Sequence, residues 1–209
     1  QRIQKQLMGT LPPERTTISR PFTYTGVDFA GPFEISNFRG RGCRISKGYA
    51  CLFVCFSTKA IHLEAVSDLS TEAFLAAFSR FVSRRGCPSE VFSDNGKNFV
   101  GAEKTLVQDF LAASRDSVQR NYQLQSISWR FIPPGAPHMG GLWEAGVKSF
   151  KTHFRKIASG LKYTFEEFST LLSKIESCLN SRPISAMSDN PDCLLALTPG
   201  HFLVGSPLL

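Results

Sequence analysis

Three acidic residues stand where a carboxylate is costly unless it binds something. Asp28 interrupts an apolar, strand-like segment, and Asp94 ends a later short apolar run, inside 93–96 (Ser-Asp-Asn-Gly). Glu144 closes 138–144 (His-Met-Gly-Gly-Leu-Trp-Glu), where a Gly/Pro loop passes into a helix. A lone acid in an apolar segment costs folding energy unless it is paired or bound to a cation, and Mg²⁺ prefers carboxylate oxygens. The three placements together indicate a divalent metal site.

The elements that must position these residues follow from the hydrophobic pattern. Apolar runs and alternation predict five strands, over 22–29, 49–56, 60–66, 90–93 and 126–132. A helical period predicts helices that run from Ser70 to a stop at Gly86, over about 100–112, over 142–159, and onward from a capping box of Thr164 and Glu167. This order is typical of an α/β domain with a mixed sheet of about five strands, flanked by helices.

The rest of the chain divides around this domain. Residues 1–20 look like a linker, 21–182 hold the domain, and 183–209 form a proline-containing C-terminal extension without strong periodicity. Gly31-Pro32 should end the first strand, and 36–47 should form a basic, glycine-rich turn. The chain opens on Gln1 rather than Met, so we expect it to be part of a longer protein.

The helix over 142–159 has two different faces. With 100° per residue, one sector of about 120° is apolar and should face the core: Leu142, Gly146, Phe150, Phe154 and Ile157. A narrow stripe opposite is first acidic and then basic: Glu144, Lys148, Lys151 and Arg155. The stripe fits a solvated face with a Glu144–Lys148 pair worth about 0.3 kcal/mol, or a catalytic carboxylate followed by a track for phosphates.

Composition sets wider bounds. The 209 residues include 24 Lys and Arg against 17 Asp and Glu, a net charge of +7, which fits a polyanionic partner and a merely basic surface equally well. Six cysteines without a C-x-x-C pair favour a reducing compartment, and four scattered histidines give no zinc-ligand spacing, so we expect no structural zinc. No apolar stretch reaches the length of a membrane span, so we expect no membrane partner.

Several motifs, in order along the chain, carry a family resemblance. Three segments resemble the catalytic core of retroviral-type integrases, the D,D,E recombinases: 27–29, 92–99 and 133–151. Five segments resemble, more narrowly, integrases of BEL/Pao-type LTR retrotransposons: 20–22 (Arg-Pro-Phe), 26–33, 140–144, 179–183 (Leu-Asn-Ser-Arg-Pro) and 197–203. The likeness runs from about residue 20 to the end.

The resemblance implies a ribonuclease H-like fold and a set of site residues. Asp28, Asp94 and Glu144 match the family's catalytic, metal-binding triad, which uses two Mg²⁺ or Mn²⁺ ions. The residues expected at DNA are Asn98, His138, Lys148, Lys151 and Arg155. The segment 135–141 matches the catalytic loop. One departure is the spacing: 49 residues separate Asp94 from Glu144, more than in retroviral members, and we place the excess in 112–125.

The activity implied is that of a two-metal polynucleotidyl transferase and endonuclease. It would process 3′ ends of retroelement DNA and then join them to target DNA by strand transfer. A catalytically inactive, domesticated DNA-binding or assembly module and a ribonuclease H-type nuclease are the alternatives. The resemblance also implies a homodimer or higher multimer acting in the nucleus, with a cytoplasmic particle before entry as an alternative location.

Three further residues near the motifs admit more than one role. Trp143, beside Glu144, is better explained as a packing anchor than as a base-stacking platform. His62 and Glu64 share one face of the strand over 60–66, where Glu64 either approaches the site or is exposed.

Overall fold

The computed structural model describes residues 11–113, 127–132, 140–158, 162–188, 190 and 195–209, and for 106–113 only the backbone. The strands are β1 (Tyr24–Ser36), β2 (Ile45–Cys55), β3 (Ile61–Val66), β4 (Glu90–Ser93), β5 (Ser128–Phe131), β6 (Tyr163–Thr164), β7 (Ser185–Ala186) and β8 (Ala196–Leu197). The helices are α1 (Pro13–Thr16), α2 (Thr71–Arg85), α3 (Lys97–Ala113), α4 (Gly141–Ile157), α5 (Phe165–Asn180) and α6 (Pro199–Val204).

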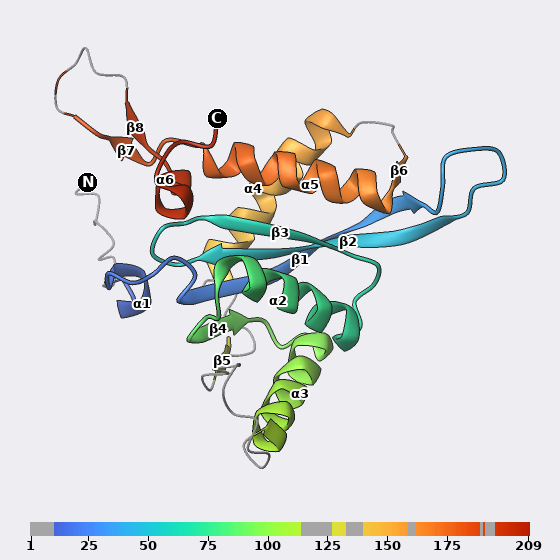
Figure 1. The fold of residues 1–209 in the computed structure, drawn as a ribbon, viewed down its shortest axis with the longest axis horizontal. Helices are drawn as coiled ribbons and strands as arrows, with labels where there is room; N and C mark the ends of the chain where they lie inside the picture. Colours follow the sequence, from blue (N-terminus) through green and yellow to red (C-terminus); the bar gives the residue numbers. More distant parts are fainter. Residues whose placement is uncertain (1–10, 114–126, 133–139, 159–161, 189, 191–194) are drawn as a thin grey trace, which may run out of the picture.

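One mixed sheet organises the domain, in the strand order β3-β2-β1-β4-β5. The first three strands pair antiparallel, whereas β4 runs parallel to both β1 and β5. The predicted five-stranded mixed sheet is confirmed, and the two-residue β6 adds a short parallel pairing to the far end of β1. Figure 1 shows α4 and α5 on one side of this sheet and α2 and α3 on the other.

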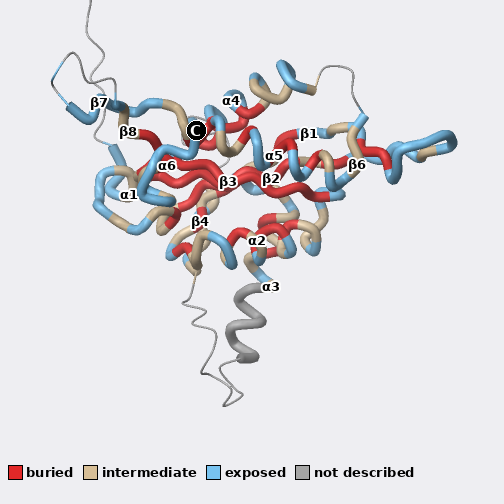
Figure 2. The backbone as a smooth tube through the Cα atoms, turned by 45° about the horizontal axis from the view of Figure 1, so that its top comes forward, coloured by how far each residue is buried: buried red, intermediate tan, exposed pale blue. Residues whose placement is uncertain are grey.

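Each face of the sheet carries its own apolar core. Alternate residues of β2 point to opposite faces, so Leu52 and Val54 pack with Trp143, Phe150 and other side chains of α4 and α5. The intervening Cys51, Phe53 and Cys55 pack with phenylalanines of α2 on the other face. Because both faces of the sheet are covered by helices, every side chain in this part of β2 is buried, which explains the continuous apolar run in its sequence. Figure 2 shows the central strands buried.

The first strand is longer than predicted, and the expected break at Gly31-Pro32 was wrong. β1 continues to Ser36, and its register with β2 is irregular between Ala30 and Phe33, so Pro32 lies where the ladder is already interrupted. A proline is tolerated at such a bulge because no donor is needed there. The basic turn over 36–47 is therefore the outer part of a long β1–β2 hairpin.

Two regions outside the predicted elements also contain structure. The N-terminal linker includes α1, and the C-terminal extension includes the β7–β8 pair and α6. The end of α4 at Ile157 falls slightly short of the predicted residue 159, and Gly160 lies outside the described residues. Within the described part of the chain, no helix is both long and apolar enough to cross a membrane.

Candidate active site

Two of the three predicted carboxylates lie at the same end of neighbouring parallel strands. The β1–β4 register ends with Gly26 opposite Phe92, and Asp28 and Asp94 each follow two residues later. A backbone amide close in sequence donates to each carboxylate: Oδ1 of Asp28 accepts from the Phe29 amide at 2.7 Å, and Oδ1 of Asp94 accepts from the Gly96 amide at 3.0 Å. Parallel pairing thus brings together two acids that are far apart in the sequence.

The third carboxylate arrives on α4, which is seated closely on the sheet. A Cβ at Gly26 would lie only 2.5 Å from Cε3 of Trp143, and one at Gly146 would lie 3.1 Å from Cγ2 of Val54. Trp143 is 3% exposed and packs in the core, as predicted for an anchor. Glu144 follows it directly, so the glycine contact at β1 sets the position of the first turn of α4 and of its carboxylate.

The electrostatics of Asp28 report that the three acids share one region. Its pKa is raised from 3.8 to about 6, first because the carboxyl is removed from water, and then because Asp94 and Glu144 repel its charge. The Phe29 amide and Lys151 act in the opposite direction. A carboxyl group whose ionisation is opposed by two neighbouring carboxylates marks a site where a hard cation would be stabilised.

The donor chemistry fits a divalent cation, although the side chains are not gathered around one. Among the described residues, no group of three His, Cys, Asp or Glu side chains already stands in an arrangement that could hold a metal ion. Asp94 and Glu144 are exposed, and Asp28 is half-buried at the strand ends. Carboxylate rotamers must therefore turn toward one another for ions to be bound.

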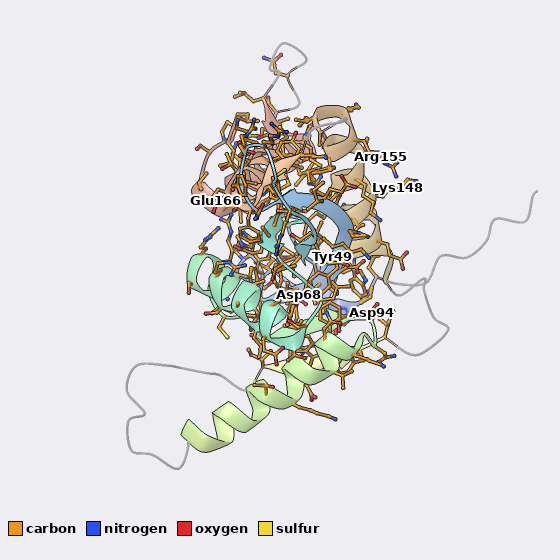
Figure 3. The ribbon with its side chains drawn as sticks, turned by 90° about the vertical axis from the view of Figure 1, so that its right-hand side faces the viewer. Tyr49, Asp68, Asp94, Lys148, Arg155 and Glu166 are labelled. Atoms are coloured by element: carbon orange, nitrogen blue, oxygen red, sulfur yellow. The ribbon has the colours of Figure 1, made fainter. Side chains whose placement is uncertain are left out.

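The predicted DNA-contact residues are only partly brought together. Lys148 and Arg155 are exposed on α4 and lie on the same side of the molecule as Asp94 (Figure 3). Lys151 is half-buried and acts electrostatically on Asp28. Asn98, at the start of α3, is half-buried, and its Nδ2 finds no partner in the described part of the structure. His138 and most of the loop 135–141 lie outside the described residues.

The two faces predicted for α4 are present, with one error. Gly146 and Phe150 are buried and Leu142 and Phe154 pack against the same core, but Ile157 is 47% exposed. The last turn of α4 lies beyond the edge of the core. Ile157 therefore stays exposed although it continues the apolar period of the helix.

His62 and Glu64 belong to a different cluster, and neither predicted position of Glu64 is correct. The His62 side chain is 1% exposed and lies 2.9 Å from Glu64, which is 5% exposed and also accepts from Arg80 at 2.6 Å. Glu176 of α5 adds a contact to His62 at 3.3 Å and an ion pair with Arg85 at 2.5 Å. Burial lowers the pKa of His62, but the hydrogen bonds that its ring donates to the carboxylates of Glu176 and Glu64 outweigh burial and raise the pKa.

This cluster ties β3 to α2 and α5. The sequence contained one signal for it: arginines recur along α2 and acids occur on β3 and α5. Their pairing required the tertiary arrangement.

Comparisons with known proteins identify the fold. No protein family model matches the chain, and no curated protein matches it. A chain in the cryoEM structure of the simian T-cell lymphotropic virus intasome in complex with PP2A regulatory subunit B56 gamma matches with a TM-score of 0.56 and 14% identity. That match covers 92% of this chain and 59% of the other chain.

The HTLV-2 integrase catalytic core domain, in complex with magnesium and in a trimeric form, gives a TM-score of 0.53 at 16% identity. That match covers 88% of this chain and 97% of the domain. The described mixed sheet with helices on both faces is therefore the ribonuclease H-like fold of retroviral integrase catalytic cores.

Proposed function

We propose that this chain is an integrase catalytic core that processes the 3′ ends of retroelement DNA and transfers them into target DNA. The observation that carries the proposal is that Asp28 and Asp94 lie at the same end of neighbouring parallel strands of an integrase-core fold, with Glu144 close enough to help raise the pKa of Asp28. The sequence motifs favour a BEL/Pao-type LTR retrotransposon as the source. The nucleus is the proposed place of action.

The proposed cofactors are two Mg²⁺ or Mn²⁺ ions held by Asp28, Asp94 and Glu144. Carboxylate oxygens suit these ions, and the HTLV-2 core with the same fold is a magnesium complex. Bound metal would neutralise phosphate charge and stabilise the attacking and leaving oxygens of an in-line displacement.

The chain's own residues then orient the substrate. Asp28 must be ionised to act as a metal ligand. Because its pKa is raised to about 6, its carboxyl group is mostly ionised at neutral pH but not in mild acid. Lys148 and Arg155 are exposed beyond Glu144 and would hold DNA phosphates without reading bases, and Lys151 would balance the negative charge at Asp28. Trp143, fixed against Gly26, would keep Glu144 in place during the reaction.

The functional unit is proposed to be a homodimer or higher multimer on DNA. One similar structure is an intasome and the other a trimeric form. An inactive DNA-binding module and a ribonuclease H-type nuclease remain the competing functions, and one assay separates all three.

The assay measures Mg²⁺- or Mn²⁺-dependent nicking and joining on duplex DNA ending in the element's terminal sequence. Asp94→Asn should abolish both products, whereas Glu166→Gln, an exposed acid on α5, should leave them unchanged. Equal products from wild type and Asp94→Asn would favour the inactive module. Preferential cleavage of RNA in RNA–DNA hybrids would favour the nuclease.

A further inference from the structure

The outer part of the β1–β2 hairpin forms an arm, defined here as residues 36–47. The ladder closes with Ser36 opposite Ile45, and the hairpin extends well past β6 and the start of α5 in Figure 1. The arm holds four cations, Arg39, Arg41, Arg44 and Lys47, and no acid. A projecting hairpin that carries positive charges and no acid adds nothing to the packing of the hydrophobic core.

The arm is an ordered structure rather than a loose loop. Its base is held by β6, which pairs with Ile35 and Ser36. Directly beyond the last ladder pair, the Asn37 amide donates to the Arg44 carbonyl at 3.1 Å, and the Arg44 amide donates to Oδ1 of Asn37 at 2.8 Å. Arg39 ties the arm to α5 through Glu167 at 2.6 Å. These bonds hold the backbone where the arm leaves the ladder and fix the side chain of Arg39.

The side chains of two arginines in the arm form no ion pair with the described residues. Arg41 and Arg44 are exposed, and no carboxylate within the described residues pairs with either side chain. Lys47 stands opposite Glu34 across the ladder, so its charge is partly balanced. The surplus positive charge lies in the part of the arm beyond the ladder, together with Phe38, which is 46% exposed.

The arm also continues the cationic stripe of α4. Its root is joined to the end of that helix, because the Phe33 ring packs 4.4 Å from the Phe154 ring, beside Arg155. At 1.5 Å per residue, the stripe from Glu144 to Arg155 spans about 16 Å. A strand of DNA following this stripe away from the triad would reach the base of the arm.

We propose that the arm binds the backbone of duplex DNA through Arg41 and Arg44, beyond the phosphates held by α4. The identity of the DNA rests on the proposed function. A two-stranded ribbon fits a DNA groove, and a guanidinium binds phosphate through two parallel hydrogen bonds.

The test is the salt dependence of binding to a short fluorescein-labelled duplex, measured by anisotropy with the 209-residue chain in EDTA. The slope of log K against log salt is negative, and each lost phosphate contact lowers its magnitude by about 0.9, so Arg41→Gln/Arg44→Gln should lower that magnitude by about 1.8. Lys104→Gln/Lys174→Gln removes the same charge from exposed sites on α3 and α5 and should change the slope much less. Arg41→Lys/Arg44→Lys should keep most of the wild-type slope.

Equal slopes for the arm and control variants would overturn the proposal. Tighter, arm-dependent binding to single-stranded RNA than to duplex DNA would also overturn it, because the partner would then be RNA. Binding is measured in EDTA, where a metal-dependent nicking and joining reaction cannot proceed, so the contribution of the arm is read separately from the activity assay. A failure of the proposed function is thus distinguishable from a failure of the arm.

Discussion

Replacing Gly26 by alanine tests how α4, and with it Glu144, is seated on the sheet. The new methyl carbon would lie 2.5 Å from Cε3 of Trp143 and 3.1 Å from Cε1 of Phe56. Favourable carbon contacts lie near 3.5–4.0 Å, so the indole or the first turn of α4 must move by about 1 Å. Trp143 is 3% exposed and cannot turn away into solvent.

The expected loss of stability follows from two opposing effects. Overpacking a filled core costs about 1–3 kcal/mol, whereas alanine in place of glycine in a strand gains about 0.5–1 kcal/mol. The net loss in the free energy of unfolding should be about 1–2 kcal/mol. A shift of about 1 Å at a catalytic group can cost about 100-fold in rate, so DNA joining should fall further than stability alone explains.

Urea unfolding measures the first effect and the joining assay the second. Gly141→Ala is the matched control for stability, because a Cβ there meets nothing within 4 Å. The double variant Gly26→Ala/Trp143→Leu should recover part of the lost joining activity, since the smaller side chain makes room. A Gly26→Ala protein with the wild-type urea midpoint and full activity would refute the idea that this contact positions Glu144.

Three further predictions concern single side chains and use the same urea assay. Asp28→Asn should raise the free energy of unfolding by about 1–2 kcal/mol at pH 7.5 in EDTA and by almost nothing at pH 4. The reason is that an acid whose pKa rises from 3.8 to about 6 on folding destabilises the wild-type protein as the pH rises through that window. A difference between variant and wild type that does not change with pH would count against the pKa shift. Glu64→Gln should cost about 2 kcal/mol by leaving Arg80 and its neighbours without their carboxylate, and an unchanged midpoint would mean that the cluster adds no stability. Thr164→Ala should cost about 1 kcal/mol, because its hydroxyl accepts from the Glu167 amide, and no loss would show that the cap is dispensable.

Local patterns predicted the elements best where one physical signal dominates. The period of Phe74, Phe78 and Phe81 defines the buried face of α2, and the capping box of Thr164 and Glu167 begins α5 as predicted. These features depend on residues within a few positions of each other. The order of strands along the chain was likewise enough to indicate a mixed sheet.

The missed features depend on partners far away in the sequence. Pro32 reads as a strand breaker until the irregular register beside it is known. The strands β7 and β8 have two residues each, too few for any periodicity. His62 and Glu64 look like half of a site, and only the positions of Arg80 and Glu176 make them a buried ionic cluster.

Some motifs that carried the family resemblance have structural roles. Arg20 donates to the carbonyls of Arg85 and Cys87, where α2 ends. Asn180 accepts from the Ile61 amide at 2.8 Å and donates to the Ile61 carbonyl at 2.7 Å, which ties the end of α5 to the edge strand β3. Such residues identify a fold because they hold its elements together, and they say nothing directly about chemistry.

The candidate site is therefore best understood as the product of two packing constraints. The parallel register fixes Asp28 beside Asp94, since both follow the Gly26–Phe92 pair by two residues. The same Gly26 has no side chain, which lets Trp143 approach β1 and brings the first turn of α4 to that strand end. One glycine thus participates in both constraints, so a change there should disturb the relation among all three acids at once, whereas a change at any single acid should leave the other two in place.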